Sequence, residues 1–240
     1  MTSGSQQLAS TDTNPTKGAV CWSCSGALAG AKLFCDVCGR TQPVDSSASY
    51  FDVFGLPRKL NIDAAALERE FYRLSRRLHP DIFARAGERE QEWSLANSSL
   101  LNDAYRTLKN PISRTEYLLK LEGMQIGEEA QERKQDRVPA DLLEEVFELN
   151  MQLEEMRANR KIGEDDPQLR AELSAAKTMF DTRLSETDAS LYSIWNAWDA
   201  ANEDAEESHE DLLKEELVAL LDRRRYIRNL VRDVNEALGA

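Results

Sequence analysis

Residues 63–81 read DAAALEREFYRLSRRLHPD, and this stretch decides how the middle of the chain folds. Its apolar residues recur at i, i+4, i+7 and i+11 and so share one face of a helix: Leu67, Phe71, Leu74 and Leu78. Proline ends that helix, because its ring clashes with the preceding turn and it lacks an N–H. We therefore expect His79-Pro80-Asp81 to form a polar turn that presents an imidazole and a carboxylate at a loop tip, where binding residues concentrate.

A second face of the same helix is basic. It carries four arginines: Arg69, Arg73, Arg76 and Arg77. These side chains could simply be a solvated face. Because Glu68 and Glu70 are confined to the first half of the helix, a cationic stripe that meets an acidic partner is the favoured interpretation.

The residues after the turn predict a partner helix and a short final helix. Residues 88–109 carry the apolar positions of an antiparallel partner, which Asn110-Pro111 ends. Ser113 is expected to cap the short helix that follows. Two antiparallel helices with short flanking helices predict a small all-helical domain over residues 49–122.

Four cysteines near the N-terminus predict a metal site. Their spacing is C-x2-C-x10-C-x2-C, and they are the only cysteines in the chain: Cys21, Cys24, Cys35 and Cys38. Two Cys-x2-Cys knuckles close a tetrahedral site that suits zinc, and four thiolates leave no open position, so we expect a structural zinc-ribbon-like module over residues 19–46. An iron centre of rubredoxin type, two disulfides and a redox pair remain alternatives. Trp22 and Phe34 are expected to pack on this module or on the neighbouring domain.

The C-terminal half is acidic and helical. Residues 123–240 carry fifteen basic and twenty-nine acidic side chains, which disfavours nucleic-acid binding. After a polar linker at 123–137, helical patterns cover about 139–158, 167–202 and 209–238, which predicts a three-helix bundle over residues 138–240. One stripe is expected to form its core: Leu142, Val146, Leu149, Leu153 and Met156.

The ends and the hydropathy of the chain exclude some classes of protein. No segment approaches the roughly 20 apolar residues of a membrane span. Residues 1–18 are polar, resemble neither a secretory signal nor a mitochondrial presequence, and are expected to be disordered. The sequence therefore predicts a cytoplasmic protein.

Four stretches of the middle segment resemble the J domain of the HscB co-chaperone family. They are FDVFGLP at 51–57, His79-Pro80-Asp81 with Phe83, LNDAYRTL at 101–108 and RTEYLL at 114–119. Ile82 stands where lysine is common in bacterial members. The resemblance implies that His79, Pro80 and Asp81, with the arginine face, contact an Hsp70 chaperone of HscA or DnaK type and stimulate its ATPase. It implies no catalytic residue in this chain, because the partner hydrolyses the ATP.

The acidic half resembles the scaffold-binding domain of the same family, best at residues 147–149 and 179–183. The resemblance implies contact with an IscU-like iron–sulfur scaffold through six residues: Leu143, Glu144, Phe147, Glu148, Met151 and Tyr226. A simpler interpretation is that Leu143 and Phe147 extend the core stripe and that Glu148 is merely solvated.

Two other functions compete with this one. A general J-protein for unfolded clients would use the cysteine module to bind substrate, but such proteins carry more cysteine pairs and long β-rich domains, and this sequence shows neither. A thiol oxidoreductase would need a free nucleophilic cysteine, which a saturated zinc site would not leave. The sequence therefore predicts an adaptor without enzymatic activity of its own.

Overall fold

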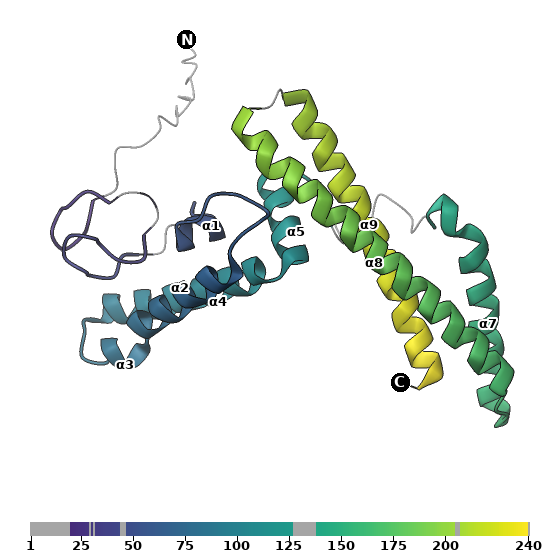
Figure 1. The fold of residues 1–240 in the computed structure, drawn as a ribbon. Helices are drawn as coiled ribbons and strands as arrows, with labels where there is room; N and C mark the ends of the chain where they lie inside the picture. The colour runs from purple at the N-terminus through teal and green to yellow at the C-terminus, as the bar shows by residue number, and fades with distance from the viewer. Residues whose placement is uncertain are drawn as a thin grey trace, which may run out of the picture. The chain divides into compact units, whose positions relative to one another are not determined.

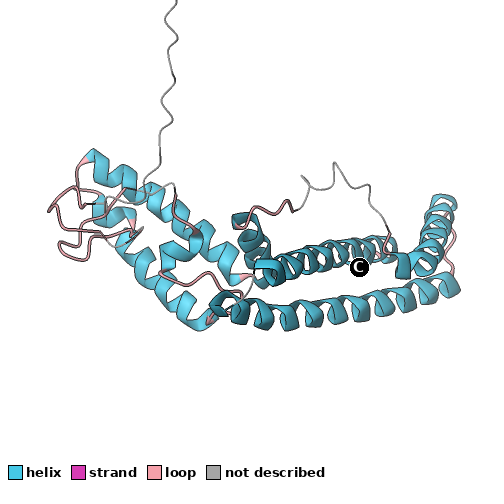
Figure 2. Cartoon of the chain, turned by 90° about the horizontal axis from the view of Figure 1, so that it is seen from above, coloured by secondary structure: helices cyan, strands magenta, loops and turns pink. Residues whose placement is uncertain are grey.

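A computed structural model of the 240-residue chain describes residues 20–28, 30, 32–43, 47–126, 138–204 and 207–239. Within these ranges, the side chains of residues 201–204 and 207–209 are not described. These residues form helices and loops, with two isolated β-bridges and no strand (Figure 2). The all-α class predicted from the sequence is confirmed. The expectations for residues 1–18 and for most of the 123–137 linker lie outside the described residues.

The helices follow one another along the chain in the order shown in Figure 1. Their bounds are α1 Tyr50–Phe54, α2 Ala64–Leu78, α3 Pro80–Phe83, α4 Glu88–Lys109, α5 Pro111–Leu121, the 3-10 turn η1 Ala140–Leu142, α7 Leu143–Ile162, α8 Pro167–Asp204 and α9 Glu207–Leu238. The chain divides into two compact units, and each is described here by itself. The first combines the residues up to Pro57 with Ala65–Arg106, and the second combines Arg58–Ala64 with the residues from Thr107 onward.

In the first unit, α2 and α4 form a helical hairpin. Leu67, Leu74 and Leu78 of α2 are buried, as the apolar periodicity predicts. Phe71, on the same face, stacks on Tyr105 of α4 with ring centroids 4.0 Å apart. The hydroxyl of Ser94 donates a 2.7 Å hydrogen bond to the carbonyl of Leu78, which satisfies a backbone acceptor at the end of α2. The end of α2 is therefore fixed to α4 where the His79 turn begins.

In the second unit, α7, α8 and α9 pack as a three-helix bundle, and the predicted core stripe of α7 is confirmed. All five residues of that stripe are buried, together with Leu173 and Phe180 of α8 and Ile227 and Val234 of α9. The first break in the bundle follows Gly163, whose φ of 75° lies in the left-handed region that favours glycine at a helix C-cap.

A polar joint ties the 58–64 segment to α5 and α8 within the second unit. The carboxylate of Asp199 accepts hydrogen bonds from the backbone N–H groups of Leu60 and Asn61 at 2.7 and 2.8 Å. Buried Arg114 donates from Nε to the carbonyl of Leu60 at 2.8 Å. Burial lowers the pKa of this guanidinium, and the nearby Asp199 charge opposes the shift. Arg114, the arginine of the RTEYLL segment, is thus a buried residue that connects α5 to the 58–64 segment.

Three local predictions are corrected by the structure. Asn110, not Ser113, caps α5: its side-chain oxygen accepts from the N–H groups of Ile112 and Ser113, because Pro111 takes the first helical position and starts the helix earlier. The residues after His79, predicted as a polar turn, form the one-turn helix α3. The first bundle helix was predicted at about 139–158, but a 3-10 turn precedes it and α7 runs from Leu143 to Ile162.

No helix among the described residues is long and apolar enough to cross a membrane.

Candidate functional sites

The cysteine module consists of two knuckles with matching hydrogen bonds. The N–H of Ser25 donates to the carbonyl of Cys21, and the N–H of Gly39 donates to the carbonyl of Cys35, each at 2.9 Å. Both donors have positive φ, 57° at Ser25 and 72° at Gly39. Each knuckle is closed by one isolated β-bridge, Val20 with Ala27 and Phe34 with Thr41. The residues that follow each Cys-x2-Cys pair therefore form the tight turns.

The four thiols converge on one point. Their sulfur atoms all lie within 4.8 Å of one another, with Cys21 and Cys38 at 3.6 Å and Cys24 and Cys35 at 3.8 Å. A tetrahedron with metal–sulfur bonds of about 2.3 Å has sulfur–sulfur edges of about 3.8 Å, so the arrangement fits a four-thiolate metal site. The predicted cluster is confirmed as a possible metal site.

Burial and hydrogen bonds shift the pKa values of two of these thiols in opposite directions. Burial alone would raise the pKa of Cys21, but hydrogen bonds from the backbone of Cys24 and Ser23 outweigh it and lower the pKa to about 6. At Cys24 a backbone hydrogen bond from Gly26 acts to lower the pKa, and burial together with the neighbouring cysteines raises it to about 12. A bound divalent metal would favour the thiolate form of its cysteine ligands.

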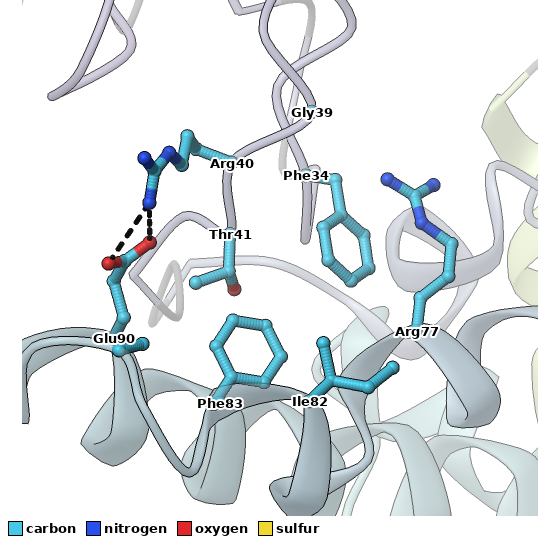
Figure 3. Close-up of a pocket in the computed structure, with 9 residues that line it drawn as sticks. Phe34, Gly39, Arg40, Thr41, Arg77, Ile82, Phe83 and Glu90 are labelled. Atoms are coloured by element: carbon cyan, nitrogen blue, oxygen red, sulfur yellow. Dashed lines mark hydrogen bonds and ion pairs between the residues drawn. The ribbon is translucent and has the colours of Figure 1, made fainter.

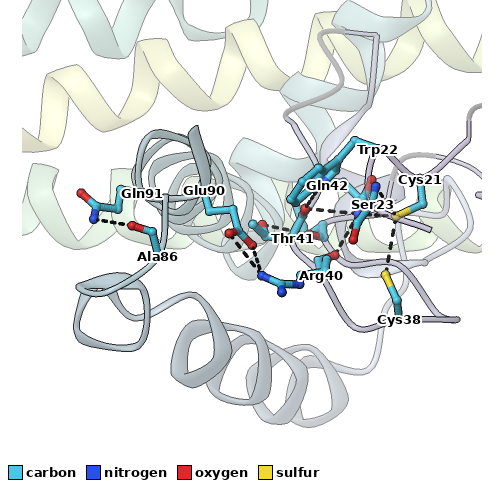
Figure 4. A network of polar contacts seen from close by, with 11 residues as sticks. Cys21, Trp22, Ser23, Cys38, Arg40, Thr41, Gln42, Ala86, Glu90 and Gln91 are labelled. Atoms are coloured by element: carbon cyan, nitrogen blue, oxygen red, sulfur yellow. Dashed lines mark hydrogen bonds and ion pairs between the residues drawn. The ribbon is translucent and has the colours of Figure 1, made fainter. Parts of the chain in front are cut away.

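The module is fixed to α4 by buried polar contacts (Figure 4). Arg40 donates from Nη1 to both carboxylate oxygens of Glu90, at 2.9 and 3.2 Å. The amide of Asn97, fully buried, donates to Thr41 Oγ1 at 3.2 Å and to the Gln42 carbonyl at 2.8 Å. Each contact joins residues at least fifty positions apart in sequence, so the module and the helical hairpin form one structure.

Aromatic contacts add to this attachment. Trp22 meets Trp93 of α4 edge to face, with ring centroids 5.5 Å apart, and donates its indole N–H to the Thr41 carbonyl at 2.8 Å. Phe34 lies beneath Arg77 of α2. The expectation that these two aromatic residues pack on the module or its neighbour is confirmed.

The His79-Pro80-Asp81 turn is exposed and locally ordered. His79 is the N-cap of α3, and its Nδ1 accepts a hydrogen bond from the N–H of Asp81 at 3.3 Å. Pro80 takes the first helical position, and Phe83 is buried and anchors the turn. The side chains of His79 and Asp81 remain 58% and 91% exposed, so both are available to a partner.

The four arginines of α2 do not behave alike. Arg73 is paired with Glu70, which raises its pKa and lowers that of the glutamate, chiefly through the hydrogen bond between them. Arg69 and Arg76 are exposed, and Arg77 is half-buried against Phe34. The basic face is therefore partly committed to contacts inside the unit.

Helix α7 presents an exposed apolar stripe. Leu143, Phe147 and Met151 follow at intervals of four residues and are 55%, 67% and 61% exposed. The simpler interpretation, that Leu143 and Phe147 extend the core, is wrong, because the core is formed by the neighbouring positions of the helix. Glu144 and Glu148 are exposed beside the stripe. Tyr226 of α9 is half-buried and packs against the bundle core.

Comparisons with known proteins identify the family. No family model matches the chain. The HscB co-chaperone homolog of Vibrio cholerae is 39% identical over 137 residues, which cover 57% of this chain and 71% of that protein. The chain belongs to the HscB co-chaperone family.

Mammalian HscB proteins are also similar to this chain. Mouse and human iron–sulfur cluster co-chaperone HscB are each 34% identical to it, and the alignments span 64% and 61% of their lengths, less than two thirds of either. Among solved structures, human HscB superposes with a TM-score of 0.63 at 27% identity, covering 91% of this chain and 98% of that one. Vibrio cholerae HscB superposes with a TM-score of 0.54 at 28% identity, covering 79% and 96%.

This HscB-family chain contains structural contacts that the sequence interpretation missed. Glu90 looked like one of several acids in α4, and no local pattern marks it as the buried partner of Arg40. Asn97 is a polar residue on the buried side of its helix, which is the one signal that could have revealed its role. No local pattern marks Asp199 as the acceptor for the 58–64 backbone, because its partners lie some 138 residues earlier in the chain.

Proposed function

We propose that this protein is a co-chaperone of iron–sulfur cluster biogenesis that stimulates the ATPase of an Hsp70 partner and presents an IscU-like scaffold to it. The observation that carries the proposal is the exposed His79-Pro80-Asp81 turn, held at the end of the α2–α4 hairpin in a chain of the HscB family. The proposal treats the protein as an adaptor, not an enzyme.

The geometry of the turn suits contact more than catalysis. The His79 Nδ1 is occupied by the Asp81 N–H, which leaves Nε2 pointing away from that hydrogen bond as the donor to a partner. Asp81 is the most exposed carboxylate of the turn and can accept from a partner's cation. The arginines of α2 add positive charge beside them and favour an acidic docking surface.

The first experiment replaces His79 with Gln. Glutamine lacks the imidazole ring and does not place a donor where Nε2 lies, so we expect stimulation of a DnaK-type Hsp70 ATPase to fall by at least tenfold while helicity is retained. Circular dichroism checks the fold, and Ser99→Ala, an exposed change in α4, serves as the control that keeps stimulation. Unchanged stimulation by His79→Gln would refute the docking role.

The α7 stripe is proposed as the scaffold surface. Three apolar side chains more than half exposed on one helix face form the kind of patch that marks an interface. Glu144, Glu148 and Tyr226 complete the proposed surface, with the carboxylates at its rim.

Replacing Phe147 with Ala tests this surface. Truncating an aromatic anchor at an interface costs about 1–2 kcal/mol or more, so we expect scaffold affinity to fall about tenfold in a calorimetric titration. Ile162→Ala is the matched control, because Ile162 is 68% exposed on the same helix but lies at its C-terminal end, eleven residues beyond Met151. Equal loss from both variants would mean that the helix, not the stripe, was perturbed.

The cysteine site is proposed to hold one structural zinc ion. When bound, zinc would offset part of the thiolate charge and supply folding energy to this small module. Elemental analysis of the purified protein should find about one zinc per chain. Iron in equal amount, with visible absorption, would indicate the rubredoxin-type alternative.

A further inference from the structure

Phe34 of the cysteine module touches the basic helix of the proposed Hsp70 site. It directly precedes Cys35 and is 8% exposed. The Arg77 guanidinium carbon lies 3.8 Å from the centroid of its ring, a close cation–π contact (Figure 3). Arg77 lies in the last turn of α2, two residues before His79, so the contact joins the cysteine loop to the edge of the proposed docking surface.

The ring has little freedom to move. Phe34 forms a β-bridge with Thr41 across the second knuckle, and Cys35 and Cys38 of that knuckle are two of the four converging thiols. Asn97 of α4 donates a hydrogen bond to the hydroxyl of Thr41. The position of the ring is thus fixed by the closed knuckle and by α4 together.

The guanidinium of Arg77 differs from that of Arg73 in its contacts. Arg73 gives its N–H groups to Glu70, whereas no described residue accepts a hydrogen bond from the Arg77 guanidinium. Stacking on a ring engages the face of a guanidinium and leaves the N–H groups at its edge available for a carboxylate. Phe34 therefore orients Arg77 without using up its donors.

The surroundings of Arg77 also suit a protein partner. A cavity of about 340 Å³ opens between the module and α3, and its lining includes Phe34, Arg77, Ile82 and Phe83. Ile82, the residue after the His79-Pro80-Asp81 turn, is 62% exposed at this cavity. The cavity and the turn thus form one continuous surface.

We propose that Phe34 is a positioning residue for Hsp70 docking: it preorients Arg77, so the cysteine module is part of the Hsp70-binding unit and not an independent appendage. The inference rests on the proposed co-chaperone function. Fixing one rotamer-rich arginine before binding removes part of the entropy cost of the complex, which raises affinity without adding a contact to the partner.

A double-mutant cycle tests this role in the full-length protein. Stimulation of a DnaK-type Hsp70 ATPase is titrated for Phe34→Leu, which keeps the apolar volume but removes the π face, and for Phe34→Tyr, which keeps the face. We expect Phe34→Leu to raise the half-maximal concentration about two- to fivefold with the maximal rate unchanged, and Phe34→Tyr to retain the wild-type value.

The same substitution is then made in two arginine backgrounds. In Arg77→Met, Phe34→Leu should have no further effect, because the stacked partner is absent. In Arg76→Met, the matched control on the same helix, the two- to fivefold effect should persist. Equal effects of Phe34→Leu in both backgrounds would overturn the inference and assign Phe34 to folding alone.

A spectroscopic readout makes the test independent of ATPase activity. The ring current of Phe34 should shift the Arg77 Nε–H resonance in NMR spectra, and Phe34→Leu or removal of the metal by a chelator should abolish the shift. An unshifted resonance in the metal-loaded wild-type protein would contradict the stacking.

The outcomes separate this inference from the proposed function. If wild-type protein gives no stimulation that depends on His79, the proposed function and this inference both fail. If stimulation depends on His79 but Phe34→Leu titrates like the wild type, only the role of Phe34 fails.

Discussion

The cysteine module and the C-terminal bundle reach a fixed structure by opposite means. The bundle buries a continuous apolar core contributed by three long helices. The module is held by four converging sulfur atoms, buried amides and the Arg40–Glu90 ion pair. Burial of apolar surface is spread over many side chains, whereas a metal site concentrates folding energy in a few bonds. The two regions should therefore respond differently to single substitutions.

The largest effect is expected from Cys35→Ser. Structural zinc contributes about 10–16 kcal/mol of apparent binding energy in small modules, so loss of one ligand should open residues 32–43. Hydrogen-exchange mass spectrometry should show rapid exchange there while α7–α9 stay protected. Ser23→Ala is the control, since Ser23 donates to the Cys21 sulfur through its backbone and not its side chain. Loss of protection in α7–α9 would contradict the expectation that the module opens without the bundle.

A core truncation in the bundle should destabilise the bundle and leave the cysteine module intact. Leu173 is 0% exposed in the core cluster, and Leu173→Ala should lower the free energy of unfolding of the bundle by about 2–5 kcal/mol. Chemical denaturation measures it, with metal content expected to stay constant. Leu212→Ala, at a 63% exposed position of α9, should change the free energy by less than about 0.5 kcal/mol.

The attachment of the module to α4 should be of intermediate strength. Glu90→Gln removes the charge that Arg40 meets, and because the Glu90 side chain is 10% exposed, we expect a loss of about 1–2 kcal/mol in the local stability of the module. Exchange at Thr41 and Gln42 should rise while the metal content of the protein stays constant. Glu92→Gln, exposed on the same helix, should leave it unchanged. Identical exchange in both variants would show that the ion pair contributes nothing.

The smallest loss of stability is expected from the ion pair between Asp141 of η1 and Arg223 of α9. Arg223 donates two 2.8 Å hydrogen bonds to the carboxylate of Asp141, and this lowers the pKa of Asp141. The Asp141 side chain is 59% exposed and that of Arg223 is 26% exposed, so solvent screens the pair and Asp141→Asn should cost less than about 1 kcal/mol.

The pH dependence of this pair has a definite sign. Because the folded-state pKa is depressed, the contribution is complete above the unfolded pKa of about 3.9 and is lost as pH falls through the folded pKa. Denaturation of wild type and Asp141→Asn from pH 7 into acid should show a difference in the free energy of unfolding that is complete at pH 7 and disappears once Asp141 is protonated in the folded state. A difference that persisted in acid would rule out the ion pair as its source.

Local sequence patterns predicted the helices and the metal cluster well because both are short-range. The periodicity of α2, the stripe of α7 and the spacing of Cys21, Cys24, Cys35 and Cys38 each depend on residues close in the chain. The cap of α5 was misassigned, because Asn110 and Ser113 are both good caps and only the position of Pro111 decides between them. The assignment of partner-binding residues on α2, α7 and α9 stays a prediction.

The sequence by itself determined the all-helical class, the four-thiol site and the exposed turn at His79. Tertiary structure alone decided that Arg40 meets Glu90, that Asp199 receives the 58–64 backbone and that Phe34 lies under Arg77. Periodicity and ligand spacing are properties of neighbouring residues, so a linear reading reveals them. A buried polar pair joins segments fifty or more residues apart, and its partner is fixed only when the helices pack.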